Sequence, residues 1–252
     1  MIRFKKIARN LLTVLLLLGA VAFAELRRQQ RVCQRLVVEV QTDRARFITP
    51  EDVRLLVTQQ QTTLLEGVRL KDIDLKMLER NVASNSYVQQ VNAYHDLAGN
   101  VVVQAQQNRP IARILAQGGG VPDAYLGADG RLLPLSDRLT ARVVLLGGDY
   151  VTTLLDASEP EDSTRAQVLE LVRYVEQDEF WRAQIAQIDI DKQREVTLYP
   201  QVGKQRIAFG PADHVPEKFN KLAVFYEQIL PRKGWNHYEQ VILKYQNQIV
   251  CQ

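Results

Sequence analysis

Hydrophobic and polar positions between residues 36 and 107 follow first a strand period, then a helix period, then a strand period again. The expected elements are a strand over residues 36–40, a helix that begins at Pro50, a second helix capped by Asp72 or Asp74, and strands over residues 88–95 and 101–107. Each element has only one apolar face to bury. This order therefore predicts a small domain in which two helices cover one face of a three-stranded sheet.

From residue 110 onward the pattern is dominated by strands. The expected strands cover residues 111–115, 125–126, 131–133, 142–146, 185–190, 195–199 and 206–209, with helices over residues 163–179 and from Pro216, and a long closing strand from Glu239 to about Val250. The fold class is therefore α+β: a small domain followed by a larger α+β domain dominated by its sheet.

An apolar run near the N-terminus predicts that the rest of the chain lies outside the cytoplasm. Residues 11–24 would span ~21 Å as a helix, short of the ~30 Å hydrocarbon core, whereas residues 7–26 are long enough for a membrane anchor. The alternative is a cleaved signal peptide, because Ala22-Phe23-Ala24 fits an A-x-A cleavage site. Basic residues directly after the run slightly favour retention. Both alternatives export residues 36–252.

The net charge of +3 is unevenly distributed. Residues 1–35 hold eight of the 32 Lys and Arg residues and one of the 29 acidic residues, which leaves 24 basic and 28 acidic residues in 36–252. The body of the chain therefore lacks the basic surface that nucleic acid requires, and we expect no nucleic-acid partner.

Catalytic and metal-binding motifs are missing from the sequence. Two cysteines, Cys33 and Cys251, could close nearly the whole chain as a disulfide, but sequence cannot decide this, and two unpaired thiols are the simpler alternative. His95, His214 and His237 have no metal-ligand spacing, and no G-x-S-x-G motif exists. We therefore expect no enzyme, no metal, no cofactor and no small-molecule substrate.

Five segments, in the same order along the chain, resemble the FtsQ/DivIB proteins of the bacterial division machinery, in the short form typical of Bacteroidetes-like bacteria. The small domain has the element order of a POTRA domain. Residues 108–114 (Asn-Arg-Pro-Ile-Ala-Arg-Ile) are the most specific match, similar to the family's R-x-P-I-A-R-I junction. The other similar segments are residues 73–79, 86–91, 125–135 with 140–148, and 243–245.

The resemblance implies a non-catalytic scaffold of cell division, anchored in the bacterial inner membrane at the division septum. It divides the chain into a cytoplasmic tail (1–9), a transmembrane helix (10–26), a linker (27–35), a POTRA domain (36–108) and an FtsQ-type β domain (109–252). The implied partners are FtsB/FtsL-like bitopic division proteins, which bind in the periplasm and help to license septal wall synthesis.

Partner contacts are expected at the closing strand, because a final strand at a sheet edge offers unpaired N–H and C=O groups for strand addition. Carried over from the family, the partner-binding residues are Leu243, Lys244, Tyr245, Asn247 and Gln248. Ile242 stands where the family has Asp, which leaves the side-chain details open. In the alternative interpretation, Leu243 and Tyr245 pack within the sheet and Lys244 is merely solvated.

Arg109, Pro110 and Arg113 are expected to fix the geometry between the two domains, a structural role. Two other function classes remain possible from the residues alone. One is a POTRA-containing outer-membrane transport or assembly component, although residues 110–252 lack the repeated strands of a membrane barrel. The other is a cleaved periplasmic hydrolase, which a mature N-terminus at Glu25 would support.

Overall fold

The computed structural model describes residues 15–20, 30–42, 45–58, 65–116, 122–151, 153, 163–246 and 248–252. The chain divides into two compact units, Met1–Gln107 and Asn108–Gln252. No helix among the described residues has the length and apolar character needed to cross a membrane. Most of the predicted transmembrane helix, residues 10–26, lies outside the described residues, which include a helical segment at 15–20.

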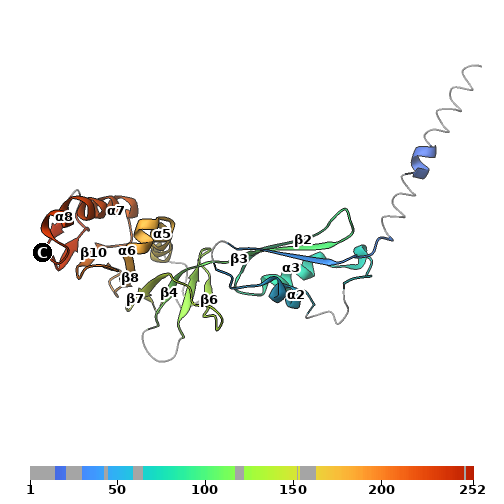
Figure 1. Ribbon diagram of the computed structural model, residues 1–252, viewed down its shortest axis with the longest axis horizontal. Coiled ribbons are helices and arrows are strands. Elements are labelled where there is room, and N and C mark those ends of the chain that lie inside the picture. Colours follow the sequence, from blue (N-terminus) through green and yellow to red (C-terminus); the bar gives the residue numbers. More distant parts are fainter. Residues whose placement is uncertain are drawn as a thin grey trace, which may run out of the picture. The chain divides into compact units, whose positions relative to one another are not determined.

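The first unit is a three-stranded sheet with two helices on one face, as the sequence predicts. Its elements are β1 (Leu36–Gln41), α2 (Pro50–Thr58), a short 3-10 turn (Leu70–Asp72), α3 (Leu75–Ala83), β2 (Val88–His95) and β3 (Val101–Gln107). The strand order is β1-β3-β2, with β1 parallel and β2 antiparallel to β3. Helix α2 contacts β1 and α3 contacts β2 (Figure 1).

The helices of this unit begin where the sequence supplies caps. Asp74 accepts a hydrogen bond from the Met77 N–H at 3.0 Å, so it is Asp74 and not Asp72 that caps α3. Thr49 and Asp52 bond reciprocally at the start of α2. The core beneath the helices is made of fully buried aliphatic side chains: Val53, Val57, Leu78, Val82, Val101 and Val103.

The second unit is built on one nine-stranded sheet among the described residues, with the order β12-β11-β10-β9-β8-β7-β4-β5-β6. Its strands are β4 (Pro110–Ile114), β5 (Ala124–Gly127), β6 (Leu132–Pro134), β7 (Val144–Gly147), β8 (Ile185–Ile190), β9 (Val196–Pro200), β10 (Arg206–Gly210), β11 (Gln240–Ile242) and β12 (Val250–Cys251). Strand β7 is parallel to β4 and β8, and β11 is parallel to β10. The other pairs are antiparallel.

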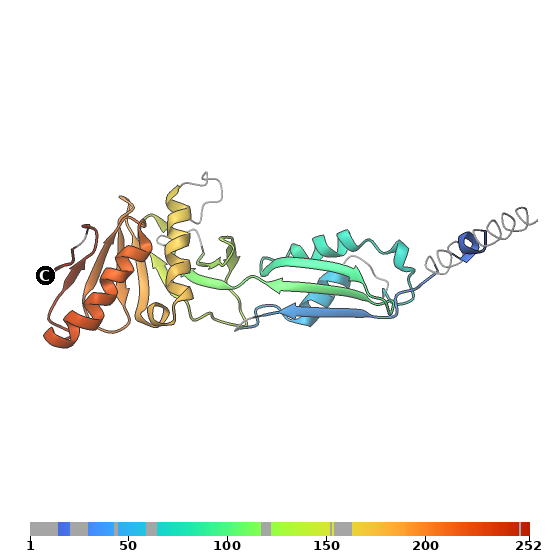
Figure 2. The same ribbon diagram turned by 90° about the horizontal axis from the view of Figure 1, so that it is seen from above.

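Helices α5 (Ser163–Gln177) and α7 (Val215–Val224) cross the same face of this sheet (Figure 2). A short helix α6 (Glu179–Gln184) precedes β8, and α7 continues through a π-helical turn (Phe225–Ile229) into α8 (Leu230–Lys233). Pro231 lacks the N–H that a regular helix would need there, which accounts for the altered hydrogen bonding at this junction. The core between helices and sheet includes Leu171, Phe209, Phe219 and Leu222.

The long closing strand predicted from Glu239 to about Val250 is wrong. The chain forms a three-residue strand, β11, then leaves the sheet and returns as the two-residue strand β12, antiparallel to β11. Smaller differences occur elsewhere: the strand predicted at 142–146 covers Val144–Gly147, and the helix predicted to residue 179 ends at Gln177. It ends there because Asp178 caps the next helix, accepting hydrogen bonds from the Phe180 and Trp181 N–H groups.

Candidate partner-binding surface

The end of the second unit that carries the C-terminus brings together β11, the loop after it and the first turns of α7. Leu243 follows β11 and remains in register with the sheet, because its N–H donates to the Ala208 carbonyl oxygen at 2.9 Å. The Leu243 side chain is fully buried in the core of the unit. Leu243 therefore holds the end of β11 in place and has no surface to offer to a partner.

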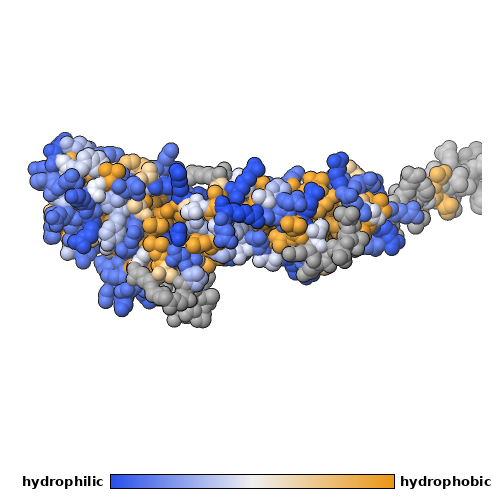
Figure 3. All heavy atoms as spheres, turned by 60° about the horizontal axis from the view of Figure 1, so that its bottom comes forward, coloured by the Kyte–Doolittle hydropathy of each residue, from blue (hydrophilic) through white to orange (hydrophobic). Residues whose placement is uncertain are grey.

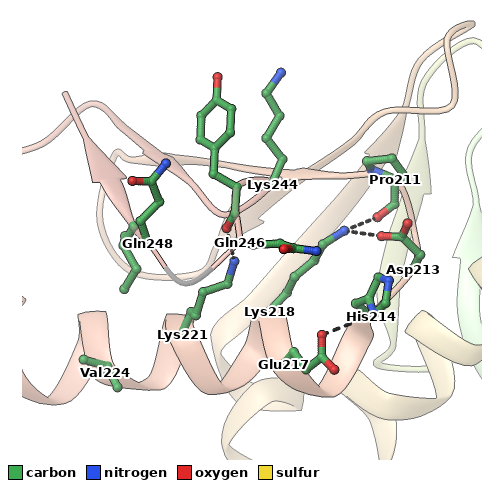
Figure 4. Close-up of a pocket in the computed structure, with 12 residues that line it drawn as sticks. Pro211, Asp213, His214, Glu217, Lys218, Lys221, Val224, Lys244, Gln246 and Gln248 are labelled. Atoms are coloured by element: carbon green, nitrogen blue, oxygen red, sulfur yellow. Dashed lines mark hydrogen bonds and ion pairs between the residues drawn. The ribbon is translucent and has the colours of Figure 1, made fainter.

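Lys221 of α7 fixes the loop that follows β11. Its Nζ donates to the carbonyl oxygen of Leu243 at 2.5 Å. It also donates to the carbonyl oxygen of Tyr245 at 2.7 Å (Figure 4). Burial, with a smaller contribution from nearby Lys218, lowers the pKa of Lys221. These two carbonyl oxygens bond to a side chain, and β11 ends at Ile242, directly before the first of them.

Lys244 and Tyr245 are both exposed at this turn. Tyr245 keeps 45% of its surface accessible, and the Lys244 Nζ lies 5.8 Å from the centroid of the Tyr245 ring. The Lys244 side chain points away from α7 (Figure 4). The backbone of Lys244 passes close to Gly210. Any other residue at position 210 would place its Cβ only 2.8 Å from the Cβ of Lys244. Gly210, with φ +80°, therefore lets the loop pack against the end of β10.

A cleft of about 830 Å³ lies between this loop and α7, and we call it the terminal cleft. Its lining includes Lys218, Lys221, Lys244, Tyr245, Gln248 and Ile249. Lys218 is buried and donates from Nζ to Asp213 Oδ1 and the Pro211 carbonyl oxygen, both at 2.6 Å (Figure 4). The charge of Lys218 is thus paired with the Asp213 carboxylate. The hydrogen bonds described for the Lys221 ammonium group, in contrast, are to carbonyl oxygens alone.

The surface around the terminal cleft is polar. Figure 3 shows mainly hydrophilic residues on the visible face of this end of the second unit. Exposed Lys244, Gln246 and Gln248 contribute to this surface, with exposed Tyr245 among them. Among the described residues, no group of His, Cys, Asp and Glu side chains could hold a metal ion. The lining carries carboxylates as well as lysines, Asp213 and Glu217 among them. An exposed aromatic side chain within a polar rim is an arrangement found at protein-binding surfaces.

Two family models match the chain and together cover nearly all of its described residues. A model described as FtsQ/DivIB, C-terminal related, matches residues 109–252, and a model of a POTRA-like domain matches residues 31–106. The chain belongs to the FtsQ/DivIB family. Membership implies a role in cell division for a protein at the membrane of the division site, and the family consists of non-catalytic division scaffolds. No curated protein matches the chain.

The structure separates the partner-binding residues that the FtsQ/DivIB resemblance predicts. Lys244, Tyr245 and Gln248 are exposed and line the terminal cleft, whereas Leu243 is buried in the core. Asn247 lies outside the described residues. None of the other four residues belongs to a strand, so side chains rather than a continuous strand present the described part of this surface.

Lys218 and Lys221, which line the same cleft, were not anticipated from the sequence. Both belong to an amphipathic helix in which Phe219 and Leu222 are buried, and lysines beside such a stripe ordinarily remain solvated. Their positions in the sequence were the one indication of this role. They stand on either side of buried Phe219, so the aliphatic parts of the two lysine side chains must pass along the apolar face of the helix. Sequence could not reveal which carbonyl oxygens they reach.

Arg109, Pro110 and Arg113 make their described contacts within the second unit. Arg109 Nη1 lies 2.5 Å from Oε1 of buried Glu176 on α5. Arg113 Nη2 donates to Asp123 Oδ2 at 2.9 Å, a bond that holds the pKa of the Asp123 carboxyl below its ordinary value, with a further contribution from the Ala116 N–H. Pro110 begins β4. Their expected role between the two units stays a prediction.

Proposed function

We propose that this FtsQ/DivIB-family chain is a bitopic scaffold of the bacterial inner membrane. In this proposal residues 1–9 are cytoplasmic, 10–26 span the membrane, 27–35 link the span to the POTRA domain (36–108), and 109–252 form the FtsQ-type β domain. The POTRA-like and FtsQ/DivIB-related matches support this arrangement. So does the basic, apolar N-terminal sequence, whose Ile7–Leu26 stretch is long enough to span.

The proposed task of the chain is to bind FtsB/FtsL-like bitopic proteins in the periplasm and so support septal peptidoglycan synthesis. The observation that carries this proposal is the exposed Lys244–Tyr245 pair, held by Lys221 beside the terminal cleft. A rigid aromatic ring with a polar tip loses little conformational entropy on binding, which suits it as an anchor. The exposed Lys244 side chain fits an acidic residue on the partner.

A pull-down from membranes tests the proposal with two surface substitutions in the full chain, Lys244→Glu and Tyr245→Ala. We expect each to lower the recovery of small coiled-coil membrane proteins by at least about tenfold, as truncation of an interface anchor costs roughly 2 kcal/mol or more. Both side chains are exposed, so the fold tolerates the changes. Circular dichroism confirms this point for each variant.

Matched controls change the same residue types at other exposed positions. Lys204→Glu lies in the turn before β10, and Tyr94→Ala lies in β2 of the first unit, where Tyr94 is 41% exposed. Both controls should recover the partners as the unchanged chain does. Equal recovery by the Lys244 and Tyr245 variants would reject the surface. Loss of recovery with Tyr94→Ala alone would instead move the site to the POTRA domain.

The membrane anchor has a separate test. The proposal requires that the mature protein retains Met1 or its immediate neighbours and stays with the membrane after a high-salt wash. N-terminal sequencing that finds Glu25 as the first residue would show that the apolar run is a cleaved signal peptide.

A further inference from the structure

Three segments of the first unit meet at one end of its sheet, where β1 begins. The Gln34 N–H donates to the Gly99 carbonyl oxygen at 3.0 Å, and the Leu70 N–H donates to the Arg31 carbonyl oxygen at 2.9 Å. Figure 2 shows the start of β1 and the turn between β2 and β3 at this same end. We call it the proximal end and define it by residues 31–35, 66–72 and 95–100.

The turn between β2 and β3 holds a leucine in solvent at the proximal end. Leu97 keeps 96% of its surface accessible, more than any other large hydrophobic residue that the structure describes. The turn is well ordered by its own hydrogen bonds, since Asp96 Oδ1 accepts from the Asn100 N–H at 2.8 Å and Gly99 adopts φ +90°. Arg31 Nη1 donates to the Leu97 carbonyl oxygen at 3.5 Å. A single exposed leucine is common in proteins, so its surroundings decide what it means.

The sheet face opposite the helices changes from apolar to polar with distance from the proximal end. Next to the turn, Val37, Val102 and Tyr94 lie side by side on β1, β3 and β2. The two rows that follow hold one acid and five amides: Glu39, Gln104, Asn92, Gln41, Gln106 and Gln90. Tyr94 is 41% exposed and lies about 10 Å from Leu97 along the chain. An apolar tip, then a tyrosine, then amides is the order expected of a surface that enters a bilayer, its headgroups and water in turn.

The charge of the proximal end favours an anionic surface. Residues 27–35 hold no acidic residue and four arginines: Arg27, Arg28, Arg31 and Arg35. The acids of the folded part are offset locally. Arg69 Nε bonds to Asp72 at 2.8 Å, Asp96 accepts hydrogen bonds within its own turn, and exposed Glu66 is balanced by exposed Lys71. The arginines therefore give this end a net positive charge, which anionic lipid headgroups attract.

The proposed topology keeps the proximal end close to the bilayer. Leu26 ends the proposed span, and Arg31 already belongs to the folded unit, so the residues between them reach at most about 18 Å. One exposed leucine with a few arginines would bind a free protein to a membrane only weakly. A chain that is already tethered makes the same contact intramolecularly, at a high effective concentration.

We propose that the proximal end docks on the outer surface of the inner membrane. Leu97 enters the boundary between headgroups and acyl chains, Tyr94 lies at the headgroups, and the arginines of residues 27–35 contact anionic lipid phosphates. The amide rows then stay in water, and the strands of the first unit point away from the bilayer. This inference rests on the proposed function, because the membrane span is what brings the proximal end to the lipid.

Tryptophan fluorescence of the full chain in nanodiscs tests the docking. The bilayer is phosphatidylcholine with phosphatidylglycerol, either plain or brominated on the acyl chains. Leu97→Trp places a reporter at the exposed turn, and the spectrum of the unchanged chain, which contains Trp181 and Trp235, is subtracted. We expect the emission of the added tryptophan to be shifted to the blue and to lose intensity in the brominated bilayer.

Gln106→Trp is the matched control, because Gln106 is exposed on the same sheet face but lies in the row farthest from the turn. Its emission should stay that of a tryptophan in water, and bromine should not quench it. Water-like, unquenched emission from both variants would overturn the docking, and so would equal quenching of both. In nanodiscs of phosphatidylcholine alone the blue shift of Leu97→Trp should be smaller, and an equal shift would overturn the role assigned to the arginines.

Flotation of the same reconstituted chain after a high-salt wash separates this inference from the proposed function. A chain that floats with lipid while the tryptophan at position 97 stays in water keeps its anchor, and only the docking fails. A chain that does not float has no membrane span, and the proposed anchor fails together with the docking. The pull-downs with Lys244→Glu and Tyr245→Ala report on partner binding independently of both results.

Discussion

Lys221 illustrates how one side chain decides where a strand ends. Residues 239–250 contain no Gly or Pro and have the composition of a continuous strand. The Lys221 Nζ nevertheless bonds to the carbonyl oxygens of Leu243 and Tyr245, and the chain turns away from the sheet. The local sequence favours a strand. The structure is decided instead by the contact with Lys221, which lies on a helix more than 20 residues earlier in the chain.

Replacing Lys221 with Met keeps the apolar stem and removes the ammonium group. We expect the loop to loosen and the free energy of unfolding to fall by about 1.5–3 kcal/mol, the usual range for hydrogen bonds to a charged donor. Urea unfolding measures this loss, and hydrogen exchange should show faster exchange at residues 243–245. Lys244→Met is the matched control, because Lys244 is exposed, and it should change stability little. Equal effects of both substitutions would contradict the role of Lys221.

Asp123 makes the stability of the second unit depend on pH in the acid range. The hydrogen bond from Arg113 lowers the pKa of Asp123 below the ordinary value of an aspartate, and the Ala116 N–H contributes in the same direction. The unfolded chain therefore binds more protons than the folded one as the pH falls below that value. The stabilisation that the ionised Asp123 carboxylate provides is fully present above the pKa that Asp123 has in the unfolded chain. It is lost as the pH falls through the pKa that Asp123 has in the folded chain.

Arg113→Met should flatten this dependence. Between about pH 5 and pH 2 the urea midpoint of the unchanged chain should fall more steeply than that of the variant, because the variant has lost the main cause of the shift. Arg232→Met removes a cation at an exposed position of α8 and serves as the control. Parallel pH profiles for the Arg113 variant and the unchanged chain would show that this pair does not act as argued.

At the scale of elements, capping residues explain why some boundaries are predictable and others are not. Asp74 marked the start of α3, and Pro50 marked the start of α2. Asp178 carried the same kind of signal, yet the apolar stripe of α5 concealed it, so one helix was predicted to run to residue 179. The order of the strands in the sheet was harder to predict from the sequence. Pairs such as β4 with β7 join segments far apart in the chain, and no local pattern encodes them.

Asp178→Ala removes the cap of α6 and should cost about 1 kcal/mol of unfolding free energy. The Asp178 carboxylate accepts hydrogen bonds from the Phe180 and Trp181 N–H groups, and Ala leaves both donors without this acceptor. Asp178→Asn is the matched control, since an Asn side chain also caps a helix well. Thermal unfolding of the two variants should separate them by several degrees, and identical midpoints would show that the cap contributes nothing.

The residues at the terminal cleft also show which features follow from the local sequence and which depend on distant parts of the chain. Sequence resemblance singled out Lys244, Tyr245 and Gln248, which are exposed at the terminal cleft, and also Leu243, which is buried. The alternation of residues 241–245 could not show that Leu243 faces the core while its neighbour Lys244 leaves the sheet. That arrangement depends on Gly210 and Lys221, which belong to other elements.

At the scale of the whole molecule, each unit has a core of its own. Leu78 is fully buried in the first unit beneath α3, and Leu171 is fully buried in the second beneath α5. A chain with two separate cores is expected to unfold in two cooperative steps rather than one. The same separation allows a change in one core to leave the other step unaffected.

Leu78→Ala and Leu171→Ala test this separation, each serving as the control for the other. Both remove the same atoms from a fully buried site, so each should destabilise its own unit by about 2–5 kcal/mol. Calorimetry of the full chain should show Leu78→Ala shifting one transition and Leu171→Ala shifting the other. If either substitution moves both transitions together, the units are energetically coupled. A signal from partner binding at the terminal cleft could then reach the POTRA-like unit through that coupling, which independent units would not permit.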